Sequence, residues 1–208
     1  MTRIAIVGTG NIGGALARLW TEAGHQVSVA TREGSTAKEI LPGMSSGPAK
    51  VIASKADLIL LAVPWAAAKQ ALASCGDISG KTLVDCTNPV LATLDGLELG
   101  TTTSAAEQLQ QLAPQARVVK AFNTIGAPLL GKATFDGLQA DGYYCGDDAA
   151  AKSAVAPLIA AAGLRPFDAG PLRNARYLEA MAMLWIDLAL KRGRGPTFGF
   201  RTLERAAT

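Results

Sequence analysis

The stretch RIAIVGTGNIGGALARLW, residues 3–20, decides how this chain folds. It opens with the apolar run Ile4 to Val7, whose composition is typical of a buried strand. A turn follows, and beyond it apolar residues recur three or four positions apart, which predicts an amphipathic helix. The turn carries the pattern G-x-G-x-x-G at Gly8, Gly10 and Gly13. A strand, a glycine turn and a helix in this order predict a dinucleotide-binding βαβ unit.

Each glycine of the turn has its own physical role. Gly8 permits the sharp bend out of the strand, and Gly10 leaves space for a pyrophosphate to approach the backbone. Gly13 lets the helix pack tightly on the strand. The helix N-terminus then presents unpaired N–H groups and a partial positive charge to the phosphates. We therefore interpret the turn as the binding site for a dinucleotide's pyrophosphate.

The end of the second strand predicts which dinucleotide is bound. The segment QVSVATRE, residues 26–33, carries Thr31 and Arg32 where NAD-binding proteins place an acid. A hydroxyl and a guanidinium suit the 2′-phosphate of NADP(H), whereas an acid would repel it. Glu33 weakens this positive field, and Lys38 adds charge from the following segment. The sequence thus favours NADP(H) over NAD(H), with an ordinary solvated strand end as the alternative.

Three later strand ends are expected at the same edge, because ligands of open α/β sheets bind beyond the carboxyl ends of the strands. The segment LLAVPW supplies Ala62 and Val63 as an apolar floor for the nicotinamide ribose. The segment VDCTNP supplies Asn88, which can hydrogen-bond a sugar or a carboxamide. The segment VVKAFNTIGA supplies the polar Asn123 and Thr124, and Gly126 there allows close approach. Their convergence favours a lined active site over three unrelated turns.

Strand and helix signals alternate along all 208 residues. Such alternation predicts an α/β fold, a Rossmann-like doubly wound and mostly parallel sheet. Hydrophobic residues make up 49% of the chain and aromatic residues 5%, which suits tight helix-on-sheet packing rather than a base-stacking surface. The expected strands are 3–8, 26–31, 57–63, 82–86, 117–122, 142–145 and 164–168.

We expect residues 1–170 to form the nucleotide-binding domain and residues 171–208 to form a C-terminal helical extension. The helix after Pro171 is apolar on nearly all sides. A monomer of this size can hardly bury every face of it, so one hypothesis is a homodimer in which it meets a partner subunit. The other is a central core helix.

Residues 34–50 are read as a short irregular helix and a loop, and residues 91–104 as a surface excursion.

Charge and cysteine content exclude several classes of protein. The net charge of +3 is dispersed, and the one cluster, KRGRG at residues 191–195, closes a helix where cations interact favourably with the dipole. This predicts no nucleic-acid partner. Cys75, Cys86 and Cys145 have no metal-ligand spacing, so we expect buried thiols and no metal.

The same features predict a cytoplasmic protein. An odd number of cysteines without a secretion signal indicates a reducing compartment, and the first strand leaves no room for a signal peptide. The most apolar helix, YLEAMAMLWIDLAL, carries Glu179 and Asp187 and is too short to span a bilayer, so no membrane partner is expected.

The chain lacks the usual groups for acid–base catalysis. Its one histidine, His25, falls in a turn before the second strand, and no Tyr-x-x-x-Lys pair occurs. An alcohol dehydrogenase needs a group that moves the hydroxyl proton. Hydride exchange between two ring cofactors needs mainly alignment and close contact. We therefore assign no catalytic side chain and favour a flavin-like acceptor.

The motifs resemble those of the coenzyme F420-dependent NADP oxidoreductase family and of the related reductase domain of STEAP-type metalloreductases. The resemblance covers nearly the whole chain. It is carried by GTGNIGGALARLWTEAGHQVSVATR, AVPW and CGDD, and most specifically by GLRPFDAGPLRNARYLEAM. It implies that NADP lies along the strand edge and that a deazaflavin ring stacks on the nicotinamide for direct hydride transfer.

The resemblance also implies residue roles. Thr9, Gly10, Asn11 and Ile12 would hold the pyrophosphate, and Thr31 with Arg32 the 2′-phosphate. The nicotinamide end would be lined by Val63, Pro64 and Ala127, with Trp65 and the segment DAGPLRNAR near the second ring. The chain departs from the family pattern at Glu33, where a basic residue is usual, and at Asn123, where deazaflavin reductases carry a histidine.

These departures leave the second substrate open between F420 and a flavin such as FMN or FAD. Two other functions also remain: a small-molecule imine or hydroxyacid reductase, and a non-catalytic NADP(H) sensor. The first usually has a large helical second domain with a catalytic lysine, which some forty residues after the sheet do not provide.

Overall fold

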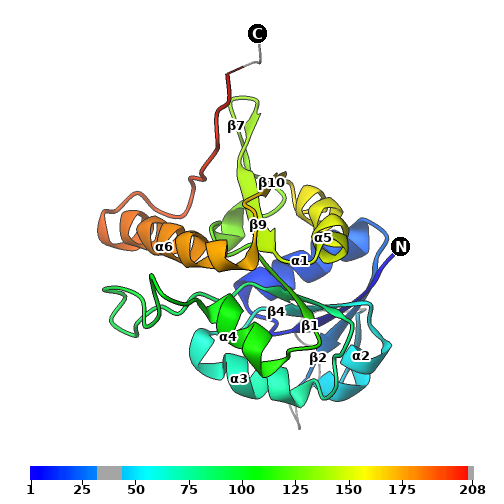
Figure 1. Ribbon diagram of the computed structural model, residues 1–208. Coiled ribbons are helices and arrows are strands. Elements are labelled where there is room, and N and C mark those ends of the chain that lie inside the picture. The colour runs from blue at the N-terminus through cyan, green and yellow to red at the C-terminus, as the bar shows by residue number, and fades with distance from the viewer. Residues whose placement is uncertain (32–43, 206–208) are drawn as a thin grey trace.

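A mixed sheet runs through the centre of the molecule in a computed structural model that describes residues 1–31 and 44–205. Its eight strands stand in the order β10-β9-β6-β5-β4-β1-β2-β3 (Figure 1). The strands are β1 (Arg3–Val7), β2 (Gln26–Ala30), β3 (Ser45–Gly47), β4 (Leu58–Leu61), β5 (Thr82–Asp85), β6 (Arg117–Ala121), β9 (Asp141–Gly146) and β10 (Arg165–Asp168).

Neighbouring strands of this sheet are parallel except at one junction. In the centre, Ile4 of β1 lies beside Val27 of β2 on one side and Leu58 of β4 on the other, in parallel register. The exception is β9, which pairs antiparallel with β6, Val119 lying opposite Gly146. Between these two strands the structure has no long crossover helix, which a parallel connection would need. The prediction of a mostly parallel, Rossmann-like sheet is confirmed.

Helices cover both faces of the sheet, which makes the fold doubly wound. The helices are α1 (Asn11–Glu22), α2 (Ala49–Lys55), α3 (Trp65–Ser74), α4 (Ala105–Leu112), α5 (Ala149–Ala161) and α6 (Ala175–Ile186). Helices α1 and α5 share one hydrophobic cluster, and α2, α3, α4 and α6 share the other (Figure 1). Because both faces are covered, β4 is buried along its whole length, and all of its residues are apolar.

Trp20 fixes α1 to its neighbours on the first face. Its side chain is fully buried, and its indole Nε1 donates to the carbonyl of Leu158 in α5 at 2.9 Å. Its ring also meets Phe122, just beyond β6, edge to face at 5.7 Å between centroids. This one side chain therefore ties the glycine-turn helix to the far half of the sheet.

The structure adds three short strands to those that the sequence predicted. Part of the segment read as a helix and loop forms β3 and the start of α2, which corrects that expectation; residues 32–43 lie outside the described residues. The other two strands, β7 (Thr134–Phe135) and β8 (Leu138–Gln139), form a hairpin. Its turn residues Asp136 and Gly137 have φ values of 47° and 80°, as an Asp-Gly hairpin turn requires.

The C-terminal extension returns across the molecule. The short helix η3 (Leu172–Asn174) leads into α6, and the π-helical turn η4 (Asp187–Lys191) ends it. Residues 196–202, which we call the strap, then run back to β9, where the N–H of Asp141 donates to Phe200 O at 2.9 Å. Beyond the strap, the chain projects beside the β7–β8 hairpin (Figure 1). In the described part of the chain, every helix is too short or too polar to cross a bilayer.

Candidate functional site

The glycine turn sits where β1 meets α1, and the structure gives each glycine a different surrounding. Gly8 has φ +106°, and a Cβ there would lie 2.2 Å from the carbonyl oxygen of Ala62. A Cβ at Gly13 would lie 1.9 Å from Gly8 O, so this position also admits only glycine. A Cβ at Gly10, in contrast, would meet no atom of the described residues within 4 Å. The turn is thus closed on the protein side and open at Gly10.

The open space at Gly10 lies at the N-terminus of α1. Gly10 is the N-cap residue, and no side chain in the described ranges 1–31 and 44–205 caps the helix. The N–H groups of the first turn are therefore available, since a helix leaves its first N–H groups without internal partners. Thr9 and Asn11 flank this space and are exposed or half-buried, and Ile12 packs against the first hydrophobic cluster. The open cradle and the unpaired donors fit a pyrophosphate.

The end of β2 lies at the same edge of the sheet, because β1 and β2 are parallel. Thr31 follows β2 and is half-buried, and its N–H donates to Gly47 O at 3.0 Å. That bond extends the pairing of β2 with β3. Arg32, Glu33 and Lys38 lie outside the described residues.

The end of β4 forms the wall beside the glycine turn. The N–H of Ala62 donates to Val7 O at 2.9 Å, which continues the β1–β4 pairing past the last strand residue. A Cβ at Gly8 would also lie 2.8 Å from Val63 Cγ1, so Val63 packs directly on the turn. Pro64 is exposed and caps α3, and Trp65 at the first position of α3 packs against the second hydrophobic cluster.

The ends of β5 and β6 are joined by a reciprocal pair of amides. Asn88 Nδ2 donates to the backbone oxygen of Asn123 at 3.0 Å, and Asn123 Nδ2 donates to Asn88 Oδ1 at 3.0 Å. Asn123 Nδ2 also donates to Leu178 O of α6 at 3.0 Å. Both amides therefore hold the strand ends together. Asn123 Oδ1 and the hydroxyl of the neighbouring Thr87 are buried without a partner in the described part of the chain.

Helix α6 and the strap close on the loop after β6. A Cβ at Gly126 would lie 2.6 Å from Cζ2 of Trp185 in α6, so only glycine admits the indole at this distance. Trp185 Nε1 donates to Phe198 O of the strap at 3.0 Å, and the two rings stack at 5.3 Å between centroids. Ala127 begins the short helix η2 (Ala127–Leu129) directly after this contact. The sequence predicted that Gly126 allows close approach, but it did not indicate Trp185 as the residue that makes this approach.

A cluster of three buried charges lies behind the same strand ends, and the sequence analysis missed it. Lys120 Nζ lies 2.8 Å from Asp85 Oδ2 and 2.8 Å from Glu179 Oε1, and the three side chains are 0%, 0% and 1% exposed. Lys120 also donates to the carbonyl of Thr87. The signal in the sequence was a charge within each of three apolar runs, VVKA, TLVDC and YLEAM.

The pKa values of Lys120 and Glu179 are shifted by burial and by the charges of their neighbours in this cluster. Burial lowers the pKa of Lys120, but the Asp85 and Glu179 carboxylates outweigh it and the net shift is upward. Burial raises the pKa of Glu179, and the net shift is upward because this effect outweighs the opposing effect of Lys120. Glu179 further accepts the N–H groups of Ala105 and Ala106 at the start of α4, at 3.1 and 3.4 Å.

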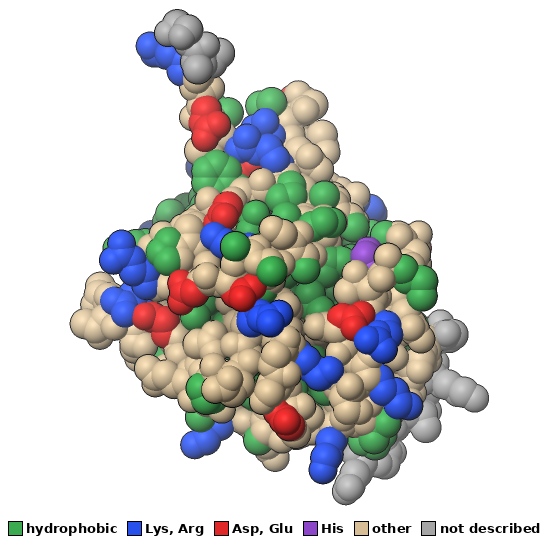
Figure 2. Space-filling model, turned by 45° about the vertical axis from the view of Figure 1, so that its right-hand side comes forward, with side chains coloured by type: hydrophobic (Ala, Val, Ile, Leu, Met, Phe, Trp, Pro, Cys, Tyr) green, Lys and Arg blue, Asp and Glu red, His purple; other side chains and the backbone are tan. Residues whose placement is uncertain are grey.

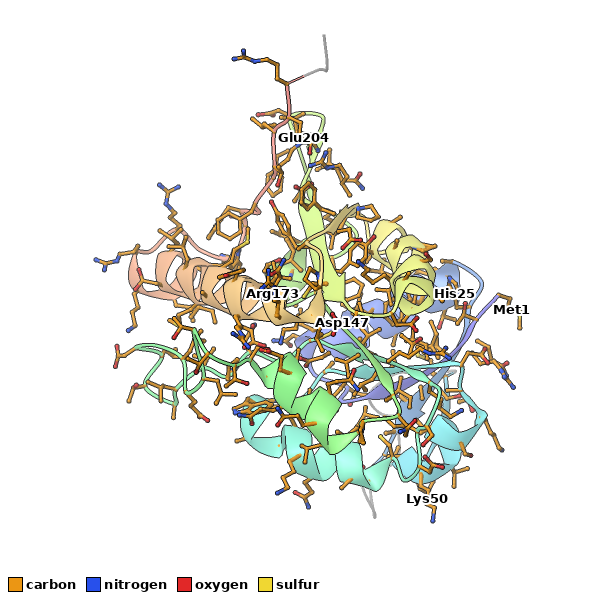
Figure 3. All side chains as sticks on the ribbon, viewed as in Figure 1. Met1, His25, Lys50, Asp147, Arg173 and Glu204 are labelled. Carbon is orange, nitrogen blue, oxygen red and sulfur yellow. The ribbon has the colours of Figure 1, made fainter. Side chains whose placement is uncertain are left out.

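The remaining ionisable groups singled out by the sequence lie away from this edge or are inert. His25 immediately precedes β2, so it lies at the amino end of the parallel strands, near the N-terminus and far from α6 (Figure 3). Burial raises the pKa of all three thiols, to about 11 for Cys75 and about 12 for Cys145. Lys191 and Arg192 of the basic cluster pair with Asp95 and Asp187. Acidic and basic side chains are interspersed on the face shown in Figure 2.

Two cavities are found away from the glycine turn. One, of about 410 Å³, is lined by the end of α3 and the loop after it as far as Ser79, and by residues 112–116 at and beyond the end of α4. It therefore lies at the amino edge of the sheet. The other, of about 550 Å³, lies between α4 and the loop carrying Asp147 and Asp148. Neither contains a residue of the predicted nucleotide site.

The fold and the turn together define a class, the Rossmann-fold oxidoreductases that use a nicotinamide dinucleotide. Residues 3–89 match the family model described as NADP oxidoreductase coenzyme F420-dependent. The F420-dependent NADP reductase of Methanothermobacter marburgensis is 32% identical over 212 residues, covering 91% of this chain and 93% of that protein. The chain therefore belongs to the F420-dependent NADP oxidoreductase family and is an NADP-dependent oxidoreductase.

Solved structures and a second relative agree with this assignment. A putative F420-dependent NADP reductase from Arthrobacter sp. FB24 is 30% identical, covers 98% of this chain and 100% of its own, and superposes with a TM-score of 0.88. Metalloreductase STEAP3 of Rattus norvegicus is 30% identical over 182 residues, which are 87% of this chain but 36% of that protein. This chain thus spans about a third of that relative. A reductive aminase from Aspergillus terreus shares the fold, at 22% identity and a TM-score of 0.70.

Proposed function

We propose that this protein transfers hydride between NADP(H) and a ring cofactor, either the deazaflavin coenzyme F420 or a flavin such as FMN or FAD. One observation carries this choice of acceptor. Among the described residues, the groups at the strand ends around the predicted nicotinamide position are amides, the hydroxyls of Thr87 and Thr124, and apolar side chains. The charges behind them are buried, at 0–1% exposure. Such a site can align two rings, but it offers no side chain to move a substrate proton.

The cofactor site that we propose runs along the carboxyl ends of β1, β2, β4, β5 and β6. The turn at β1 would hold the pyrophosphate through main-chain N–H groups, and the residues after β2 would hold the 2′-phosphate. The ends of β4, β5 and β6 would surround the nicotinamide. The residues are Gly8, Thr9, Gly10, Asn11, Ile12, Gly13, Thr31, Arg32, Ala62, Val63, Pro64, Asn88, Asn123 and Ala127.

Bound NADPH supplies a hydride, and the acceptor ring takes up this hydride together with one proton from solvent. The chain's own residues would act by position. Ala62 and Val63 would give the nicotinamide an apolar surface that excludes water, and the buried acceptor Asn123 Oδ1 lies at the same strand ends. Trp185 against Gly126 would bound the space beyond the nicotinamide, where we place the second ring.

A turnover assay separates this function from the two alternatives. NADPH mixed with catalytic amounts of protein and an excess of F420, FMN or FAD should be oxidised at a rate proportional to protein. A small-molecule imine or hydroxyacid reductase would instead consume NADPH only with those substrates. A sensor would bind NADPH without consuming it under any of these conditions, and that result would overturn the proposal.

We further propose a homodimer in which α6 of residues 171–208 meets a second copy. Tyr177 and Leu184, one helical heptad apart on α6, are 71% and 52% exposed, which is unusual for apolar side chains on an otherwise packed helix. Sedimentation that shows a monomer at micromolar concentration would refute this.

The free state of all three cysteines and the need for NADPH fit a reducing cytoplasm.

A further inference from the structure

The buried charge cluster holds both backbone polar groups of one residue of the site, Thr87. Asp85 Oδ1 accepts the N–H of Thr87 at 2.8 Å, and Lys120 donates to the carbonyl of the same residue. Asp85 and Lys120 are themselves paired at 2.8 Å. Thr87 is therefore fixed by two buried charges, and the next residue is Asn88.

Helix α6 adds a second attachment through two consecutive residues. Glu179 binds Lys120, and the carbonyl of Leu178 accepts Asn123 Nδ2. Asn123 is bonded in turn to Asn88. The connections form a closed loop of contacts from α6 through Lys120 and Thr87 to Asn88 and back through Asn123. The amide pair of this loop lies at the strand ends where we place the nicotinamide, and its charged groups lie behind them.

Backbone strain occurs at the same place. Phe122, between Lys120 and Asn123, has φ +62°, a left-handed conformation that is unfavourable for a bulky side chain. Such conformations persist where the surroundings over-determine them. Here Lys120 is held on one side, Asn123 on the other, and the Phe122 ring lies against Trp20. The cluster therefore holds the loop after β6 in a shape that it would not adopt alone.

We propose that Lys120 and Glu179 are positioning residues for hydride transfer. Through Thr87, Asn88 and Asn123 they fix the strand ends that orient the nicotinamide, without touching the cofactor or the acceptor. This inference rests on the proposed function. Stability alone is a poor explanation for the cluster, because buried ion pairs are often matched or exceeded in stability by apolar side chains of the same volume.

The chain supplies a matched control for this proposal. Arg176 of α6 forms a second ion pair with Glu107 of α4, with Arg176 Nη2 2.6 Å from Glu107 Oε1. This pair also joins α6 to the body of the protein, but its hydrogen bonds within the described residues go to Thr101 and Ser104 rather than to the strand ends. Glu107→Gln therefore removes the same charge from the same helix contact as Glu179→Gln, away from the strand ends.

The test uses the full-length protein and three readouts: calorimetric affinity for NADPH, the fluorescence lifetime of the bound nicotinamide, and kcat with F420 or FMN. For Glu179→Gln we expect NADPH affinity within about 3-fold of wild type, because the pyrophosphate turn is untouched. The lifetime should shorten as the ring gains freedom, and kcat should fall about 10- to 100-fold, the range that a misplacement approaching 1 Å produces. Glu107→Gln should leave all three readouts at the wild-type level.

A triple variant keeps the proposal testable if Glu179→Gln folds poorly. Lys120→Met with Asp85→Asn and Glu179→Met leaves no unpaired buried charge at this cluster and should fold, yet it should show the same short lifetime and low kcat. Wild-type values in this variant, or equal losses in Glu179→Gln and Glu107→Gln, would overturn the positioning role. If the wild type reduces no ring acceptor, the proposed function fails, and the lifetimes with NADPH alone still decide between these outcomes.

Discussion

Gly10 and Gly13 should respond in opposite ways to the addition of a side chain, although they lie three residues apart in one turn. A Cβ at Gly13 would lie 1.9 Å from the carbonyl oxygen of Gly8, and backbone cannot move aside as a flexible side chain would. Overpacking of this kind lowers the free energy of unfolding by about 1–3 kcal/mol, and we expect a loss of about 3 kcal/mol for Gly13→Ala. For a domain of this size, 1 kcal/mol corresponds to about 2–4 °C, so Gly13→Ala should lower Tm by about 6–12 °C.

Gly10 faces open space and has φ −68° and ψ −163°, which any residue adopts. Gly10→Val should therefore lower the free energy of unfolding by no more than about 1 kcal/mol, because it replaces a favourable N-cap residue. Its isopropyl group would instead occupy the proposed pyrophosphate position. A charged hydrogen bond contributes about 1.5–3 kcal/mol, so losing even one should weaken NADPH binding about 10- to 150-fold.

Two measurements on the two variants decide the matter: thermal unfolding without ligand, and calorimetric titration with NADPH. The expected pattern is a stable Gly10→Val that binds NADPH at least about 10-fold more weakly than wild type, and a destabilised Gly13→Ala. Wild-type affinity in Gly10→Val would show that the nucleotide does not lie over the turn. A Gly13→Ala variant as stable as wild type would contradict the close helix–strand packing.

Three further predictions concern the nucleotide, the pH dependence and the strap. Arg32→Ala should weaken NADPH binding by about 1.5–3 kcal/mol and leave NADH binding nearly unchanged, as measured by calorimetry; equal losses would show that Arg32 does not bind the 2′-phosphate. The Arg3 guanidinium lowers the pKa of Asp57 from 3.8 to about 2, so this pair should stabilise the fold above pH 3.8 and cease to do so as the pH falls through about 2. Thermal unfolding of wild type and Asp57→Asn should differ near neutral pH and converge below pH 2, and a difference that grows with acid would refute the assignment. Trp185→Ala should lower the free energy of unfolding by about 3 kcal/mol, because the half-buried indole loses its packing and its bond to Phe198. The same substitution should speed tryptic cleavage after Arg194. Unchanged cleavage would show that Trp185 does not hold the strap.

The parts of the fold that the sequence predicted are those set by local pattern. The run from Ile4 to Ile12 contains its own strand, turn and helix start, so its fold follows from contacts between residues close in sequence. The β7–β8 hairpin is equally local, and the Asp-Gly dipeptide at its turn is the sequence signal for it. The direction of β9 was not set locally, because a strand's own residues do not reveal which way its neighbour runs.

The candidate site divides in the same way. Gly8 and Gly13 were predictable because the constraints on them come from the turn itself and from the adjoining β4. The Lys120 cluster was not, since Asp85 lies 35 positions and Glu179 59 positions away in sequence. The sequence shows that each of these charges lies in an apolar run and must be paired, but only the three-dimensional packing shows with which partner. The contact of Trp185 with Gly126 escaped prediction for the same reason.

The central claim, direct hydride transfer from NADPH to a ring acceptor, is tested most directly by following the transferred hydrogen. NADPH that carries deuterium at the transferable position of the nicotinamide C4 would be mixed with the protein and oxidised F420 in a single turnover, and the reduced deazaflavin examined by mass spectrometry and NMR. The account predicts one deuterium on the reduced ring carbon, retained in ordinary water. Reduced F420 without deuterium, or NADPH that is bound and never oxidised by F420, FMN or FAD, would contradict it.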